Sequence, residues 1–163
     1  MSRIVVLGGG ESGVGSAVLA KVKGFDVFLS DMGKISEEYA STLKKWDIPF
    51  EEGKHSEELI LNADEVIKSP GIPATAPMVQ KIESHGIGII SEIEFAGRYD
   101  SAKKIYITGS NGKTTTTSLI YHLLQQAGLN VGLGGNIGKS YAYQVATENF
   151  DIYVLELSSF QLD

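Results

Sequence analysis

The segment that runs from Thr108 to Thr115 combines residue types that can bind a polyphosphate. It reads Thr-Gly-Ser-Asn-Gly-Lys-Thr-Thr and lies between an apolar run, expected to be a strand, and a stretch expected to form a helix from Lys113 to Ala127. Glycines let successive backbone N–H groups point at phosphate oxygens, and the helix start adds the positive end of its dipole. Lys113 could reach the β- and γ-phosphates, and the Thr114 hydroxyl could bind Mg²⁺. The sequence therefore predicts an ATP site that comprises Gly109, Ser110, Asn111, Gly112, Lys113, Thr114, Thr115 and Thr116.

One glycine of the usual ATP-loop pattern is missing. That pattern places a glycine six residues before the lysine, and here Ile107 occupies this position, so that Gly109 begins a shorter loop. Glu156 ends an apolar run about 40 residues downstream, where acidic residues often hold Mg²⁺. We therefore predict a metal site formed by Thr114 and Glu156. The alternatives are a glycine turn that happens to precede a lysine and a solvated carboxylate at the end of a strand.

A second glycine loop lies near the N-terminus. Gly8 to Gly13 read Gly-Gly-Gly-Glu-Ser-Gly and fit the pattern G-x-G-x-x-G between an expected strand and an expected helix. Asp31 follows at the end of the next apolar run, where an acid can accept a hydrogen bond from a ribose hydroxyl. This pattern predicts a nucleotide diphosphate site, but it does not choose between NAD and a sugar nucleotide such as a UDP compound. A tight turn without a ligand is the structural alternative.

Short apolar runs alternate with helical periodicity along the chain, and this order is typical of parallel sheets covered by helices on both faces. We expect an α/β fold with a Rossmann-like domain at 1–98 and the beginning of a P-loop ATPase domain at 99–163. The boundary is placed in the polar segment 99–104. Because the second part is small for a nucleotide-binding α/β layer, we expect a truncated piece of a longer protein. Strands are expected at 4–7, 27–29, 65–68, 88–90, 105–107, from 131 and at 152–155, and helices at 13–23, 36–46, after 77, at 91–99 and at 113–127.

Composition narrows the class of protein. A formal net charge of −6 argues against a non-specific nucleic-acid binder, and the absence of cysteine excludes disulfides and cysteine-ligated zinc. No apolar run is long enough to span a membrane, so we expect a cytoplasmic protein with no membrane insertion. His55, His85 and His122 are scattered without the spacing of metal ligands, and we expect them to be surface or core residues.

The motifs resemble those of the Mur ligase family. Residues 108–115 resemble its ATP loop, Gly134-Gly135-Asn136-Ile137-Gly138 its next motif, and Ser69-Pro70-Gly71-Ile72 its N-terminal uridine-nucleotide domain. Residues 155–162, Leu-Glu-Leu-Ser-Ser-Phe-Gln-Leu, are similar to the members that add D-glutamate to UDP-N-acetylmuramoyl-L-alanine. The resemblance implies that ATP phosphorylates the substrate carboxylate and that the amine of D-glutamate attacks the resulting acyl phosphate, in peptidoglycan precursor synthesis.

The resemblance also implies roles for individual residues. Lys113 would be the catalytic residue that neutralises the transferred phosphate, and Thr114 and Glu156 would hold Mg²⁺. The family often has an apolar residue and a threonine where Glu11 and Ser12 stand, so we expect Glu11 to point at the base or ribose, or outward. The UDP substrate would contact Gly10, Glu11, Ser12, Asp31, Ser69, Gly71, Asn136, Ser158 and Ser159.

Several expectations concern the whole enzyme. The resemblance implies a modified lysine at a second Mg²⁺ and a C-terminal domain for D-glutamate, both beyond Asp163, so we predict that this chain alone is catalytically inactive. We expect the full-length protein to be a monomer. Three alternatives stay open: another ligase of the Mur or folylpolyglutamate type, an NAD-binding Rossmann oxidoreductase, and a non-catalytic nucleotide-binding module.

Overall fold

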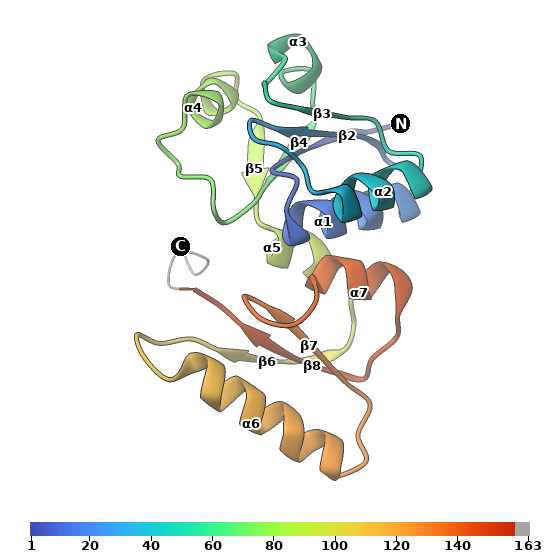
Figure 1. Cartoon of the computed structure of the whole chain (residues 1–163), viewed down its shortest axis with the longest axis vertical. Helices are drawn as coiled ribbons and strands as arrows, with labels where there is room; N and C mark the ends of the chain where they lie inside the picture. The colour runs from blue at the N-terminus through green and yellow to red at the C-terminus, as the bar shows by residue number, and fades with distance from the viewer. Residues whose placement is uncertain (159–163) are drawn as a thin grey trace.

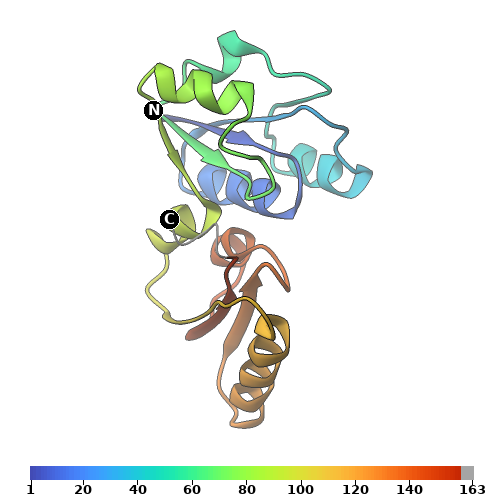
Figure 2. The same cartoon turned by 90° about the vertical axis from the view of Figure 1, so that its left-hand side faces the viewer.

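A computed structural model describes residues 1–158 and shows two parallel sheets, one above the other along the long axis of the molecule (Figures 1 and 2). The predicted α/β class, with a Rossmann-like sheet first, is confirmed. The first sheet has the strand order β3-β2-β1-β4-β5, and the second has the order β6-β8-β7. The strands are β1 (Arg3–Leu7), β2 (Asp26–Asp31), β3 (Phe50–Glu52), β4 (Glu65–Lys68), β5 (Gly88–Ile90), β6 (Lys103–Ile107), β7 (Val131–Gly135) and β8 (Ile152–Glu156).

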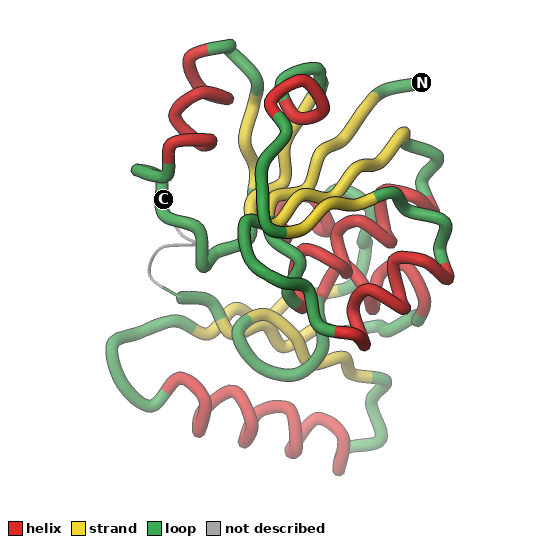
Figure 3. The backbone as a smooth tube through the Cα atoms, turned by 45° about the horizontal axis from the view of Figure 1, so that its top comes forward, coloured by secondary structure: helices red, strands yellow, loops and turns green. Residues whose placement is uncertain are grey.

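Helices cover both faces of the first sheet, as Figure 3 shows. Neighbouring residues of β1 point to opposite faces: Ile4 and Val6 pack with α1, α2 and α5, whereas Val5 and Leu7 pack with α3 and α4. Both faces of β1 are apolar because both are buried, as expected for a central parallel strand. The helices are α1 (Glu11–Val22), α2 (Glu37–Lys45), α3 (Glu57–Ile60), α4 (Pro77–Ser84) and α5 (Glu92–Gly97).

The second sheet lies between α6 (Lys113–Gln126) and α7 (Tyr141–Thr147). Helix α6 packs on one face of β8 through Val154, whereas α7 packs on Tyr153 and Leu155 of the other face. The opposite side of α7 contacts α1 and α5 of the first part. The core of the first part therefore continues through α7 into the second sheet (Figure 1). The expected division between residues 98 and 99 falls between α5 and β6 and stays a prediction.

The sequence located most of the helices and strands and missed three of those that the structure describes. Every expected strand and helix is present, and Ser36 caps α2 by accepting a hydrogen bond from the Tyr39 N–H at 3.3 Å. The sequence analysis assigned neither β3 nor α3, each shorter than five residues. It also missed α7, which is buried on two sides and therefore lacks the one-sided apolar stripe of a surface helix. No helix within residues 1–158 has the length and apolar character needed to cross a bilayer.

Candidate functional site

The phosphate loop predicted at 109–114 joins β6 to α6. Helix α6 begins at Lys113, which confirms the predicted start. Gly109 has φ +147° and Gly112, the residue before the helix, has φ +73°, a region of backbone conformation that favours glycine. Residues 108–112 are exposed, so the first N–H groups of α6 lie at the surface, where an anion could bind them.

Thr114 and Glu156 meet at this loop. The Thr114 hydroxyl lies 3.0 Å from a carboxylate oxygen of Glu156, which is only 4% exposed. Glu156 ends β8 and pairs in register with Ile107 of β6. Ile107, which stands where the usual pattern has a glycine, is the buried last residue of β6, and the loop begins after it. The Lys113 ammonium donates to the Gly109 carbonyl at 2.7 Å and so lies across the loop.

Three further residues predicted to contact the substrate, Asn136, Ser158 and Ser159, come from segments next to this loop or after β8. The backbone N–H of Asn136 donates to the carbonyl of Glu156 at 2.9 Å, so the turn after β7 is attached to the end of β8. Gly135 permits this contact, because a Cβ there would lie 2.1 Å from the same carbonyl oxygen. Ser158 is the second residue after the end of β8. Ser159 lies outside the described residues.

The N-terminal glycine loop is held tightly between β1 and α1. Gly8 has φ +100°, and a Cβ on Gly8 would lie 2.5 Å from the Ser69 hydroxyl. A Cβ on Gly13 would lie 1.8 Å from the Gly8 carbonyl oxygen. These two positions therefore require glycine, as the pattern predicted. Helix α1 begins at Glu11 after Gly10, two residues earlier than expected, and no side chain caps it.

Asp31 closes this loop. Its carboxylate accepts hydrogen bonds from the backbone N–H of Gly9 at 2.5 Å and from that of Gly33 at 2.7 Å. Asp31, which is expected to bind a ribose hydroxyl, thus already accepts two hydrogen bonds from the backbone. Each of its carboxylate oxygens keeps a lone pair that can accept a hydrogen bond from a ribose hydroxyl. The hydroxyl of Ser69 is buried without a hydrogen-bond partner among the described residues, next to Gly8.

Glu11 and Ser12 belong to this loop but hydrogen-bond to residues outside it. The Glu11 carboxylate accepts from the Tyr39 hydroxyl at 2.7 Å and from the Ser140 N–H at 2.9 Å, and its hydrogen bond with Tyr39 raises the pKa of that phenol to about 12. Ser12 hydrogen-bonds to Glu92. The Glu11 carboxylate thus lies at the start of α7, and its expected contact with the base or ribose stays a prediction.

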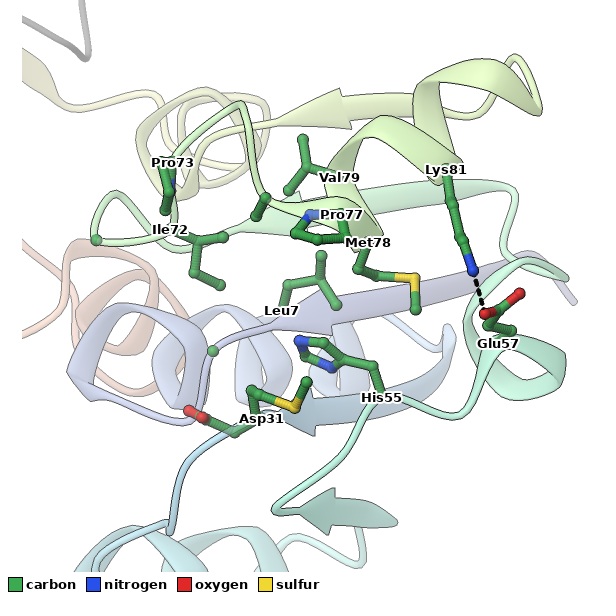
Figure 4. Close-up of a pocket in the computed structure, with 14 residues that line it drawn as sticks. Leu7, Asp31, His55, Glu57, Ile72, Pro73, Pro77, Met78, Val79 and Lys81 are labelled. Atoms are coloured by element: carbon green, nitrogen blue, oxygen red, sulfur yellow. Dashed lines mark hydrogen bonds and ion pairs between the residues drawn. The ribbon is translucent and has the colours of Figure 1, made fainter.

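A cavity of about 430 Å³ opens beside this loop at the carboxyl end of the first sheet (Figure 4). Asp31 and Gly71, both predicted, line it, and Lys68 shapes its wall by donating to the Ile72 carbonyl at 2.6 Å. Gly8 and Ile72 also line it and belong to segments that the sequence analysis named, whereas most of the other lining residues come from segments that it did not connect with the loop. The full lining is Leu7, Gly8, Asp31, Met32, His55, Glu57, Gly71, Ile72, Pro73, Ala76, Pro77, Met78, Val79 and Lys81.

Glu92 joins the two parts of the chain at the start of α7. Its carboxylate, 3% exposed, accepts from the Ser140 hydroxyl at 2.5 Å and from the Ala142 N–H at 3.0 Å. Burial raises the pKa of Glu92, and the charge of Glu11 adds to this effect, whereas the hydrogen bonds from Ser140, Ala142 and Ser12 oppose it. The net direction is upward because desolvation is the largest cause.

This raised pKa predicts a pH-dependent difference between the wild type and Glu92→Gln. A proton binds Glu92 more tightly in the folded state than in the unfolded state, so its contribution to stability is complete below the ordinary value of 4.5 and is lost as pH rises through the higher folded-state pKa. We expect the stability of the wild type relative to Glu92→Gln to fall as pH rises over this interval. Urea unfolding from pH 4 to 8 measures it. The exposed neighbour Glu94 supplies the control Glu94→Gln, and an equal pH trend in both variants would contradict the assignment.

These features define a parallel α/β protein in which a Rossmann-like sheet is followed by a second parallel sheet that carries a phosphate loop. Two family models match it: the MurD N-terminal domain over residues 3–78 and the Mur ligase middle domain over residues 107–163. The chain belongs to the Mur ligase family.

Sequence relatives extend this result over the whole chain. The chain is 67% identical over 163 residues to the UDP-N-acetylmuramoylalanine--D-glutamate ligase of Bacteroides thetaiotaomicron, covering 100% of this chain and 37% of that protein. It is 61% identical over 160 residues to the enzyme of the same name from Porphyromonas gingivalis, covering 98% and 36%. The chain thus spans little more than a third of the length of these curated relatives.

Solved structures show the same fold. The UDP-N-acetylmuramate:L-alanyl-gamma-D-glutamyl-meso-diaminopimelate ligase of Neisseria meningitidis aligns with a TM-score of 0.63 at 26% identity, covering 96% of this chain and 52% of that chain. The UDP-N-acetylmuramate-alanine ligase of Thermotoga maritima aligns with a TM-score of 0.59 at 23% identity, covering 96% and 37%.

Proposed function

We propose that this chain forms the nucleotide-binding front part of an ATP-dependent, ADP-forming ligase that adds D-glutamate to UDP-N-acetylmuramoyl-L-alanine in peptidoglycan precursor synthesis. The observation that carries the proposal is the Thr114–Glu156 pair at the start of α6, 3.0 Å apart. The names of the relatives at 61–68% identity support the substrates. Membership of the Mur ligase family argues against the oxidoreductase alternative. The relatives that match over 98–100% of this chain carry the same name, and this favours D-glutamate addition over a folate substrate.

The phosphate loop supplies the ATP part of this reaction. N–H groups of residues 109–114 would bind the β- and γ-phosphates, and the Lys113 ammonium would move from the Gly109 carbonyl to the phosphate oxygens. Thr114 and Glu156 offer hydroxyl and carboxylate oxygens, which suit Mg²⁺, and the metal would neutralise charge on the phosphates. Within residues 1–158 no cluster of three or more acidic or histidine side chains could hold a metal, so phosphate and water oxygens would complete its coordination.

The N-terminal loop supplies the second substrate. The diphosphate would bind near the start of α1, and the base and ribose would occupy the 430 Å³ cavity beside Asp31 and Gly71. A carboxylate oxygen of the alanyl end would attack the γ-phosphorus and release ADP, giving an acyl phosphate. The D-glutamate amine would then attack the carbonyl carbon, lose a proton and release phosphate. In this proposal the chain positions both reactants and stabilises the transferred charge, which is what phosphoryl transfer chiefly requires.

Ligand binding and product formation are measured separately to test this proposal. We expect calorimetry on the chain to detect UDP and, separately, ATP with Mg²⁺, with NADH as the negative comparison. Because the chain spans little more than a third of the length of its curated relatives, we expect no ligation product from the chain with both substrates. Binding of NADH in place of UDP would overturn the proposal, and product above background would overturn the expected inactivity. Cytoplasmic location and a monomeric full-length enzyme remain predictions.

A further inference from the structure

His55 is the histidine of the cavity, and the sequence analysis gave it no role. It lies in the segment between β3 and α3 and lines the cavity with Asp31 and Met78 (Figure 4). Its ring nitrogen Nδ1 lies 2.7 Å from the hydroxyl oxygen of Ser30, a fully buried residue of β2. The other ring nitrogen, Nε2, has no hydrogen-bond partner within residues 1–158 and is not among their buried unpaired atoms.

The contacts of Ser30 fix which nitrogen of His55 carries the proton. The Ser30 hydroxyl oxygen also lies 2.8 Å from a carboxylate oxygen of Glu51. Although burial raises the pKa of Glu51, hydrogen bonds from Ser56 and Ser30 and the charge of Lys54 lower it below its usual value, so the carboxylate is ionised and can only accept. Two oxygen atoms this close need a proton between them, and Ser30 must provide it.

The direction of this first hydrogen bond determines the second. With its proton directed to Glu51, the Ser30 oxygen can only accept from His55, so Nδ1 must carry a hydrogen. In a neutral imidazole the other nitrogen is then a bare acceptor. The two hydrogen bonds that link Glu51, Ser30 and His55 therefore give the cavity a hydrogen-bond acceptor at Nε2 of His55.

The groups around His55 keep its ring neutral near pH 7. Burial lowers the pKa of His55, and the charges of Glu51 and Asp31 oppose this effect only in part. The remaining charged groups that line the cavity, Glu57 and Lys81, form an ion pair with each other. Asp31 accepts from two backbone N–H groups. The cavity thus combines apolar walls with acceptors that favour a ligand able to donate a hydrogen bond.

We propose that His55 selects the base of the bound nucleotide by accepting a hydrogen bond at Nε2 from a ring N–H. This inference rests on the proposed function, because it places the base of a UDP compound in the cavity. Uracil carries a hydrogen on N3, between its two carbonyl groups, and can donate it to Nε2. Cytosine has a bare nitrogen at the same position, so two acceptors would face each other. His55 is therefore a specificity-determining residue that favours uracil over cytosine.

The test compares UDP with CDP on the same chain. Both ligands carry the same ribose and diphosphate, so the ratio of their dissociation constants at pH 7.5 isolates the base. We expect the wild type to prefer UDP by about tenfold or more, the size of one buried hydrogen bond made or left unpaired. His55→Leu should reduce the ratio at least about fivefold, to near unity. The matched control is His122→Leu on the exposed surface of α6, which should leave the ratio unchanged.

A second measurement needs no variant. Protonation of His55 turns Nε2 into a donor, so the preference of the wild type for UDP should fall as the pH drops below the usual histidine range, while the common diphosphate cancels in the ratio. Failure of the wild type to bind UDP would overturn the proposed function. Binding of UDP with a ratio that His55→Leu leaves unchanged would overturn the role of His55 alone, even if acid changes the ratio, because the N3 of cytosine itself takes up a proton at low pH.

Discussion

Gly15→Ala is expected to destabilise the protein by about 2 kcal/mol or more, the upper range for overpacking a tight interior. A Cβ on Gly15 would lie 1.8 Å from the Ser140 hydroxyl oxygen and 3.0 Å from the Tyr143 backbone nitrogen. Ser140 cannot simply rotate away, because its hydroxyl donates to the buried carboxylate of Glu92. Helices α1 and α7 must separate to admit one methyl group. Urea unfolding, followed by circular dichroism, measures the loss.

Gly97→Ala provides the matched control. Gly97 also lies in a helix, α5, but a Cβ there would meet no atom within 4 Å. Alanine favours a helix over glycine by up to about 1 kcal/mol, so this variant should be neutral or more stable than the wild type. Equal stability of Gly15→Ala and Gly97→Ala would show that α1 and α7 do not pack as described.

The contact at Gly15 also shows why α7 matters beyond stability. Backbone N–H groups at the start of α7 donate hydrogen bonds to Glu92 of α5 and to Glu11. Glu11 begins α1 and is part of the N-terminal glycine loop. The turn that precedes α7 contains Asn136, whose N–H is attached to Glu156. The two candidate nucleotide loops are therefore connected through one short helix. A substitution at this junction could shift one loop relative to the other without touching either ligand.

Local chemistry made the two glycine loops predictable from sequence. Gly8, Gly13 and Gly112 lie where the backbone turns or packs too closely for a side chain. Such local requirements can be recognised from the residues of a short segment. The pairing of Thr114 with Glu156 was also predictable, because the carboxyl ends of adjacent parallel strands meet at one edge of a sheet.

Distant contacts explain what the sequence did not reveal. Glu11 occupies a motif position typical of ligand contact, yet it binds Ser140, a residue 129 positions away in the chain. His55 lies in a segment without apolar periodicity, and its function depends on the buried hydroxyl of Ser30. No pattern of spacing within either segment encodes these partners. They arise only when the sheets and α7 are assembled.

Lys113→Ala should weaken the binding of ATP with Mg²⁺ roughly 100-fold or more, since a lysine that bridges two phosphates makes charge-assisted hydrogen bonds of about 1.5–3 kcal/mol each. The fold should not change, because the hydrogen bond of the ammonium to the Gly109 carbonyl is the contact described for this side chain, at the surface of the loop. Calorimetry with ATP and Mg²⁺ measures the loss, and circular dichroism checks the fold.

The control for this prediction is Lys103→Ala, which removes an exposed lysine from the far end of β6 in the same sheet. It should bind ATP within about twofold of the wild type, since screening at physiological salt weakens the pull of a charge more than about 8 Å from the phosphates. Binding of UDP should be unaltered in both variants, because the N-terminal loop and its cavity contain neither residue. Equal losses of ATP binding in both variants would mean that net charge, rather than the position of Lys113 at the start of α6, governs the phosphate site.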